Sequence, residues 1–233
     1  MEKQKILSVE NLKVVLNDKK ILENVSFSIN AGEVLAIIGP NGAGKSILLK
    51  TVLGLIKPTT GKIEWMPNVN IGYLPQRFHV DYYLPMTIKE FLKLKPKPAY
   101  SLKQVLEMVS VKESWLKKNL AHLSSGELQK VLLAWAILDK PHILLFDEPT
   151  ENVDIVNQES IYKLLHDLQK KLDIALILIS HDLHIVYRYA NHVLCLNKDM
   201  LCYGEPEILN AETLSKLYED HAFFHHHHYE KES

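Results

Sequence analysis

The segment GPNGAGKS, residues 39–46, matches the pattern G-x-x-x-x-G-K-[S/T] at every specified position. The largely apolar run EVLAII comes directly before this segment. The run KSILLKTVLGLI begins with the last two residues of the segment, and its apolar residues recur at helical spacing. Three of the nine glycines in the chain fall in this segment. Since glycine lets a backbone turn tightly with its N–H groups pointing inward, the sequence predicts a phosphate-binding loop between a buried strand and a helix.

This loop is the candidate nucleotide site of the chain. Lys45 supplies a positive charge for the β- and γ-phosphates, and Ser46 offers a hydroxyl to Mg²⁺, a hard cation that prefers oxygen ligands. The N-terminus of the following helix also favours an anion. The alternative is a chance glycine-rich turn, which the flanking strand and helix disfavour. The predicted nucleotide-binding residues of the loop are Gly39, Pro40, Asn41, Gly42, Ala43, Gly44, Lys45 and Ser46.

A second candidate site lies in HILLFDEPT, residues 142–150. Its apolar strand places Asp147 at the carboxyl-terminal edge of a sheet, where ligands bind in open α/β folds. Asp147 can hold Mg²⁺ through water. Glu148, with an ordinary pKa of about 4.3, is ionised at neutral pH and can orient or deprotonate a water molecule. The alternative is that the two acids only cap the next segment, which is less favoured beside a phosphate loop.

A third motif, LSSGE at residues 123–127, precedes a helical pattern. Its serine hydroxyls and free backbone N–H groups could bind a phosphate at the helix N-terminus. Taken alone, the motif reads more simply as an ordinary helix cap.

Composition and the order of the predicted elements limit the possible protein class and fold class. The 233 residues carry a net charge of −1 and are 47% hydrophobic, which is typical of a globular protein and not of a bulk nucleic-acid binder. The longest apolar runs are too short to cross a bilayer. Apolar strands such as HILLFD and IALILIS alternate with helical patterns, so we expect a parallel α/β sheet. With only Cys195 and Cys202, we expect no disulfide framework, a reducing cytoplasm, and two cysteines that pack as small hydrophobic side chains.

The order of the motifs resembles that of the nucleotide-binding subunits of ABC transporters. The chain shows GPNGAGKS, LPQ, LSSGE, ILLFDEPT, NVD and LISHD in that order, and the resemblance covers about residues 5–210. It implies an α/β phosphate-loop fold with a mostly parallel central sheet, an antiparallel β subdomain and an inserted α-helical subdomain at about residues 77–140. We accordingly expect one domain over residues 1–220 and a flexible histidine-rich tail over 221–233.

The resemblance also implies roles for individual residues. Gln76 would contact Mg²⁺ and sense a membrane partner, His181 would contact the γ-phosphate, and Asp154 would cross a dimer interface. Two copies would enclose two ATP molecules, with the LSSGE segment of one facing the phosphate loop of the other. The implied Mg²⁺ site uses Ser46, Gln76 and Asp147, and the implied signature residues are Ser124, Ser125, Gly126 and Glu127.

Three residues depart from the family pattern. Ser125 stands where glycine is usual, and Glu127 where glutamine is common. Leu16 aligns with an aromatic residue that stacks on the adenine base, so we expect weaker base contact there. None of these changes removes Lys45, Glu148 or His181, so hydrolysis is still expected.

Within the family, the stretches IGYLPQRFHVDYYLPMTIKEFLKLKP, SGELQKVLLAWAIL and SHDLHIVYRYANHVLCLNKDMLCYGEPE resemble those of the ATP-binding subunits of bacterial zinc importers. This resemblance implies an integral membrane permease and an external zinc-binding protein as partners, and a place at the cytoplasmic face of the inner membrane. Histidine is a good zinc ligand, and five of the twelve histidines lie in the last thirteen residues: His221, His225, His226, His227 and His228. The tail could instead be an expression tag or a solvated terminus. Manganese or iron as cargo, a non-transport ABC-type ATPase and a soluble phosphate-loop kinase remain alternatives; no nucleic-acid partner is expected.

Overall fold

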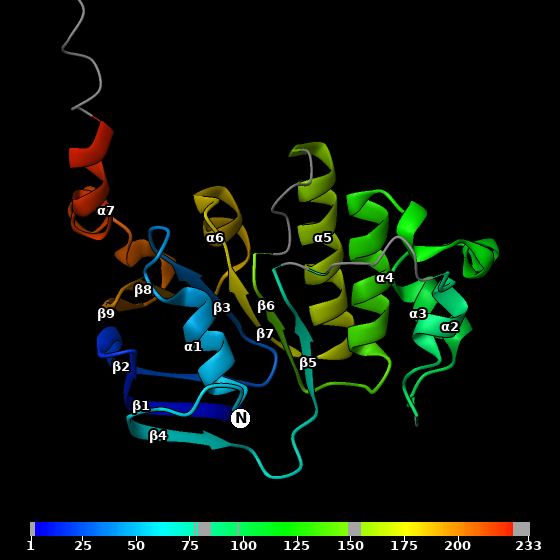
Figure 1. Ribbon diagram of the computed structural model, residues 1–233, viewed down its shortest axis with the longest axis horizontal. Coiled ribbons are helices and arrows are strands. Elements are labelled where there is room, and N and C mark those ends of the chain that lie inside the picture. Colours follow the sequence, from blue (N-terminus) through cyan, green and yellow to red (C-terminus); the bar gives the residue numbers. More distant parts are fainter. Residues whose placement is uncertain (1–2, 77, 79–84, 97, 149–154, 226–233) are drawn as a thin grey trace, which may run out of the picture. The chain divides into compact units, whose positions relative to one another are not determined.

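The computed structural model describes residues 3–76, 78, 85–96, 98–148 and 155–225. The chain forms two compact units (Figure 1). The first contains Met1–Ile6, Asn30–Gly32 and Met66–Leu178, and the second contains Leu7–Ile29, Glu33–Trp65 and Ile179–Ser233. The predicted division into one domain and a tail stays a prediction. In the described part of the chain, no helix combines the length and the apolar character that a membrane span requires.

The first unit has a parallel three-stranded arrangement. β6 (Ile143–Phe146) pairs with β5 (Ile71–Leu74) on one side and with β7 (Ala175–Ile179) on the other. All residues of β6 and β7 are buried, as expected for strands covered on both faces. A Cβ at Gly72 would lie 2.9 Å from the carbonyl oxygen of Ala136, so glycine permits the close approach of helix and strand.

In the described part of the sequence between β5 and β6, the regular elements are helices, as expected for the predicted helical insertion. They are α2 (Ile88–Leu92), α3 (Leu102–Met108) and α4 (Ser125–Ile137), together with the short 3₁₀ helices Glu113–Lys117 and Leu120–His122. Each of the three α-helices begins with a capping box, in which the N-cap hydroxyl and the acidic or amide side chain three residues later exchange hydrogen bonds with the backbone. α5 (Ile155–Leu172) follows β6.

The second unit is built on strands in the order β4-β1-β2-β9-β8-β3. Their bounds are β1 (Lys5–Leu16), β2 (Lys19–Asn30), β3 (Val34–Ile38), β4 (Thr60–Trp65), β8 (His192–Asn197) and β9 (Asp199–Gly204). β3 pairs in parallel with β8, whereas β1 with β4 and β8 with β9 are antiparallel. The unit also contains α1 (Lys45–Val52), α6 (Leu183–Tyr189), the 3₁₀ helix Pro206–Ile208 and α7 (Ala211–His225). Parallel and antiparallel strands with helices confirm the predicted α/β fold.

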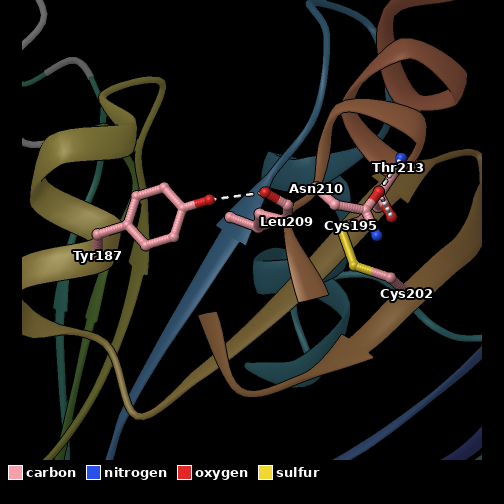
Figure 2. Close-up of a disulfide and its surroundings, with 6 residues drawn as sticks. All are labelled: Tyr187, Cys195, Cys202, Leu209, Asn210 and Thr213. Atoms are coloured by element: carbon pink, nitrogen blue, oxygen red, sulfur yellow. Dashed lines mark hydrogen bonds between the residues drawn. A yellow bond between two sulfur atoms is a disulfide. The ribbon is translucent and has the colours of Figure 1, made fainter. Parts of the chain in front are cut away.

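The two cysteines correct one prediction. Cys195 on β8 and Cys202 on β9 are direct partners in the antiparallel register, with their Cα atoms 4.8 Å apart, and they form a disulfide (Figure 2). Directly opposed residues on antiparallel strands bring their Cβ atoms close enough for such a bond. The expectation of two unbonded, purely hydrophobic cysteines is therefore wrong. Figure 2 also shows Tyr187 of α6, whose hydroxyl donates a hydrogen bond of 2.7 Å to the carbonyl oxygen of Leu209.

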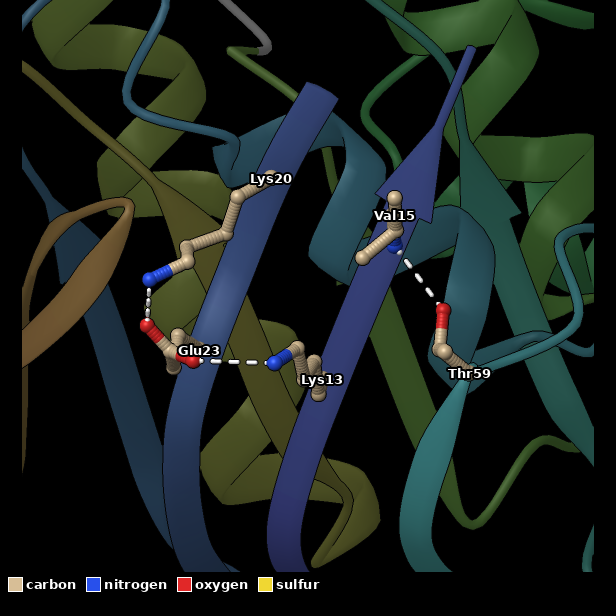
Figure 3. Close-up of polar contacts among 5 residues, drawn as sticks. All are labelled: Lys13, Val15, Lys20, Glu23 and Thr59. Atoms are coloured by element: carbon tan, nitrogen blue, oxygen red, sulfur yellow. Dashed lines mark hydrogen bonds and ion pairs between the residues drawn. The ribbon is translucent and has the colours of Figure 1, made fainter. Parts of the chain in front are cut away.

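Side chains also tie the antiparallel strands together. Asn17 and Asp18, the two residues between β1 and β2, have φ values of 48° and 59°, as a tight hairpin turn requires. The Glu23 carboxylate accepts hydrogen bonds from Lys13 at 3.1 Å and from Lys20 (Figure 3). The Val15 N–H donates to the Thr59 hydroxyl at 2.9 Å, which fixes the end of β1 to the residue before β4 (Figure 3).

Candidate functional site

The predicted phosphate loop joins β3 to α1 in the second unit. The loop begins at Gly39, whose φ is 153°, and reaches the helix through Gly44, whose φ is 99°. A Cβ on Gly39 would lie 1.9 Å from the carbonyl oxygen of Leu196, and one on Gly44 would lie 3.0 Å from that of Ile21. Neighbouring backbone therefore demands glycine at both ends of the loop, and the loop is held tightly against the strands beneath it.

Lys45 lies folded back over this loop. Its ammonium group donates to the carbonyl oxygens of Gly39 at 2.8 Å and of Pro40 at 3.0 Å, and the residue is only 5% exposed. Because a buried ammonium is costly without strong partners, this position favours an incoming polyanion. Ser46, in the first turn of α1, is half-buried, whereas Asn41 and Gly42 are exposed at the tip of the loop. The geometry suits a polyphosphate.

His181 belongs to the same unit as the phosphate loop. The N–H of Ser180, the preceding residue, donates to the carbonyl oxygen of Ile37 at 3.3 Å, one residue before the end of β3. The following residue, Asp182, caps α6 by accepting from the N–H of His184 at 2.8 Å. His181 is exposed between these two anchors. The neighbours of His181 therefore hold it beside β3, the strand that precedes the phosphate loop, and the residue is exposed to a ligand.

Asp147 and Glu148 follow β6 in the first unit. Asp147 is 2% exposed, and its N–H donates to the carbonyl oxygen of Leu74 at 3.0 Å. Burial, followed by the nearby charge of Asp147, raises the pKa of Tyr73 to about 12. Glu148 has a φ of 50°, an uncommon conformation for a residue with a side chain and one that is found where function requires it.

Gln76 and Glu148 are in contact. The Gln76 amide Nε2 donates to the Glu148 Oε2 at 2.7 Å. The parallel register explains the contact: Leu74 pairs with Phe146, so the residues two positions beyond each strand also meet. The contact orients the carboxylate that sequence analysis assigned as the catalytic base. The carboxylate of Asp147 and the amide oxygen of Gln76 are donor types that Mg²⁺ prefers. Ser46, the third expected ligand, belongs to the other unit, and the complete set of three stays a prediction.

The LSSGE segment starts α4 in the first unit. Ser124 is the N-cap, and its hydroxyl accepts from the N–H of Glu127 at 3.3 Å. Glu127 in turn accepts from the N–H of Ser124 at 3.0 Å and from the Lys118 ammonium at 2.8 Å. The hydrogen bond from Lys118, and then that from the Ser124 backbone, hold the pKa of Glu127 below its ordinary value. Sequence reasoning missed Lys118, since a partner nine residues away has no local signature.

A cavity of about 100 Å³ adjoins this helix start. Its lining comprises Trp115, Ser124, Gly126, Glu127, Lys130, Ser160 and Ile161. The start of α4 therefore borders a small hollow whose lining is both polar and apolar.

The other predicted site residues are placed as follows. Leu16 is half-buried at the end of β1. Asp154 and His226–His228 lie outside the described residues, as do the side chains of His221 and His225. Among the residues that the structure describes, no three His, Cys, Asp or Glu side chains gather in a way that could hold a metal ion.

Known proteins resemble this chain over most of its length. The profile of the ABC transporter family matches residues 22–151. The zinc import ATP-binding protein ZnuC of Haemophilus influenzae is 42% identical, covering 97% of this chain and 86% of that protein. A solved chain from a transporter assigned to the metal-chelate type, in an inward-facing conformation, has a TM-score of 0.83 at 31% identity, covering 93% and 89%. The ADP conformation of MJ1267, an ATP-binding cassette of an ABC transporter, has a TM-score of 0.79 at 26% identity, covering 94% and 99%.

Proposed function

Because the chain belongs to the ABC transporter family, we propose that it is the ATP-hydrolysing subunit of a zinc importer. The observation that supports nucleotide chemistry most directly is the phosphate loop, with its glycine-enforced turns and the Lys45 ammonium above it. The cargo assignment rests on relatives named as zinc import proteins, such as the one from Haemophilus influenzae.

Hydrolysis would use the residues already described. The loop N–H groups and Lys45 bind the β- and γ-phosphates and neutralise charge there. Mg²⁺, held by oxygens of Ser46, Asp147 and Gln76, would supply further neutralisation of the phosphates. Glu148, oriented by Gln76, accepts the proton of the attacking water, and His181 contacts the γ-phosphate.

We propose further that the working unit is a homodimer. In each copy the LSSGE segment, with Ser124, Ser125, Gly126 and Glu127, contacts ATP bound to the loop of the other copy, and Asp154 crosses the interface. Each nucleotide then receives its full set of donors only when two copies close around it, so closure and reopening follow ATP binding and hydrolysis. The dimer would attach to an integral membrane permease at the cytoplasmic face of the bacterial inner membrane, with an external zinc-binding protein delivering the ion.

The tail histidines are proposed zinc ligands. Neutral imidazoles bind Zn²⁺ well, and five of them occur between His221 and His228. A protein lacking residues 221–233 should bind Zn²⁺ more weakly than the full chain in equilibrium dialysis. Equal binding by the two forms would assign the tail no role in zinc.

Metal uptake tests the main proposal. Cells lacking this protein would be complemented with the wild type or with Glu148→Gln, and zinc, manganese and iron uptake would be measured separately at limiting concentration. Zinc uptake restored only by the wild type is the expected result. Restored manganese or iron uptake would support the ATPase assignment and would show that the cargo is that metal and not zinc. An unchanged uptake of all three metals would overturn the importer assignment.

A further inference from the structure

We propose that Lys118 is a positioning residue for the LSSGE segment, where it cancels the charge of Glu127 and fixes that side chain at the start of α4. The inference rests on the proposed function, because it concerns how this segment meets a nucleotide triphosphate. It assigns a role to a residue that lies outside the segment in the sequence and that no motif marks.

The Glu127 carboxylate is held through both of its oxygens. Oε1 accepts from the Lys118 ammonium at 2.8 Å, and Oε2 accepts from the Ser124 N–H at 3.0 Å. The Lys118 ammonium also lies 4.0 Å from the centre of the Trp115 ring. A cation over an indole face is favourable, so Trp115 holds Lys118 in place for Glu127.

The backbone places Lys118 firmly. Its N–H donates to the carbonyl oxygen of Trp115 at 2.8 Å, and its own carbonyl oxygen accepts from the N–H of Ile88 at 3.0 Å. The residue is thus anchored to the end of one 3₁₀ helix and to the first residue of α2. The backbone from which the Lys118 side chain reaches Glu127 is therefore fixed by hydrogen bonds on both sides.

The charge of Glu127 explains why such a partner is useful. The lowered pKa keeps the carboxylate ionised at neutral pH. Negative charge in the first turn stabilises α4, but the same charge beside a bound triphosphate is repulsive. Lys118 resolves this conflict, since an ammonium at 2.8 Å makes the pair neutral overall while the cap is retained. Lys130, on the cavity adjoining Glu127, adds a second positive charge to this surface.

A purely structural ion pair makes a different prediction from a charge-compensating one. If the pair only stabilised the helix, its loss would lower thermal stability and leave the ATP dependence of activity unchanged. If it compensates charge, its loss should raise the KM for ATP, the rise should shrink at high salt, and removing the charge of Glu127 should reverse it.

The test uses full-length Lys118→Met, with Lys117→Met as the matched control and Lys118→Met/Glu127→Gln as the rescue. ATPase activity would be measured against ATP concentration at low and high salt. We expect Lys118→Met to raise the KM roughly three- to fivefold at low salt, as is reasonable for one partly exposed ion pair. The double variant should return to the KM of Glu127→Gln alone, and Lys117→Met should match the wild type.

Two further readouts make the result decisive. Thermal unfolding of each variant checks that it is folded. ATP binding by the separated monomers should be equal in wild type and Lys118→Met, because in the proposed dimer the LSSGE segment contacts the nucleotide held by the other copy. A Lys118→Met protein with wild-type KM, or a double variant that is not rescued, would overturn the proposal. Absence of ATPase activity in the wild type would instead contradict the proposed function.

Discussion

The carbonyl oxygen of Leu196 occupies the space into which a side chain at Gly39 would project, with only 1.9 Å between that oxygen and an added Cβ. Leu196 belongs to β8, directly after the disulfide at Cys195. The N–H of Lys198, in the turn between β8 and β9, donates to the carbonyl oxygen of Ala43 at 3.0 Å. The β8–β9 hairpin therefore supports the phosphate loop at its first residue and again near its end.

Gly39→Ala tests this contact. The added methyl group must displace backbone, so we expect the free energy of unfolding to fall by about 1–3 kcal/mol and ATP affinity to fall with it. Gly54→Ala is the matched control, because Gly54 also has a positive φ, 75°, but nothing lies within 4 Å of its added Cβ. Chemical denaturation and calorimetric ATP titration would measure both effects. Equal losses of ATP affinity in the two variants would contradict the support by Leu196.

Reduction of the disulfide should weaken the same support. Closing a loop of this length stabilises a protein by roughly 2–3 kcal/mol in the chain-entropy view, so a reductant should lower the unfolding temperature and weaken ATP binding. In a Cys195→Ala/Cys202→Ala variant, the reductant should change neither the unfolding temperature nor ATP binding. Thiol titration of the unreduced, denatured protein would give the bonded fraction directly. Two titratable thiols per chain before reduction would show that the bond is not formed.

Glu148→Gln should separate binding from hydrolysis. The substitution keeps the shape of the side chain but removes the base, so we expect kcat to fall by about a hundredfold or more while ATP affinity is retained. Lys45→Ala should instead lose affinity, because its ammonium lies over the loop carbonyls. Near-normal turnover by Glu148→Gln in a coupled phosphate-release assay would remove this residue from the catalytic role.

Features that one local pattern carries are predictable from the sequence alone. The glycine spacing in residues 39–46 indicates the loop, and LSSGE before a helical pattern indicates a helix cap, which the structure shows as a capping box between Ser124 and Glu127. Pairings between distant segments were not readable in this way. The contact of Gln76 with Glu148 follows from the register of two parallel strands 72 residues apart, and the bond between Cys195 and Cys202 follows from the register of a hairpin. Register depends on packing and turn geometry, which the separate motifs do not contain.

The stability that Glu127 contributes should depend on pH in a defined direction. Its pKa is lowered in the folded protein, first by Lys118 and then by the Ser124 backbone, so the unfolded chain takes up a proton before the folded one does as pH falls. The contribution, at most about 1 kcal/mol for a partly exposed pair, is fully present above the ordinary glutamate pKa and is lost as pH falls through the lowered value. The difference in unfolding free energy between wild type and Glu127→Gln should therefore be constant from neutral pH down to about pH 5 and then shrink. Lys118→Met should show a weaker pH dependence of this kind, because the larger cause of the shift is gone. A difference that grows on acidification would mean that the carboxylate is held in its protonated form, and would contradict the ion pair on which the role of Lys118 depends.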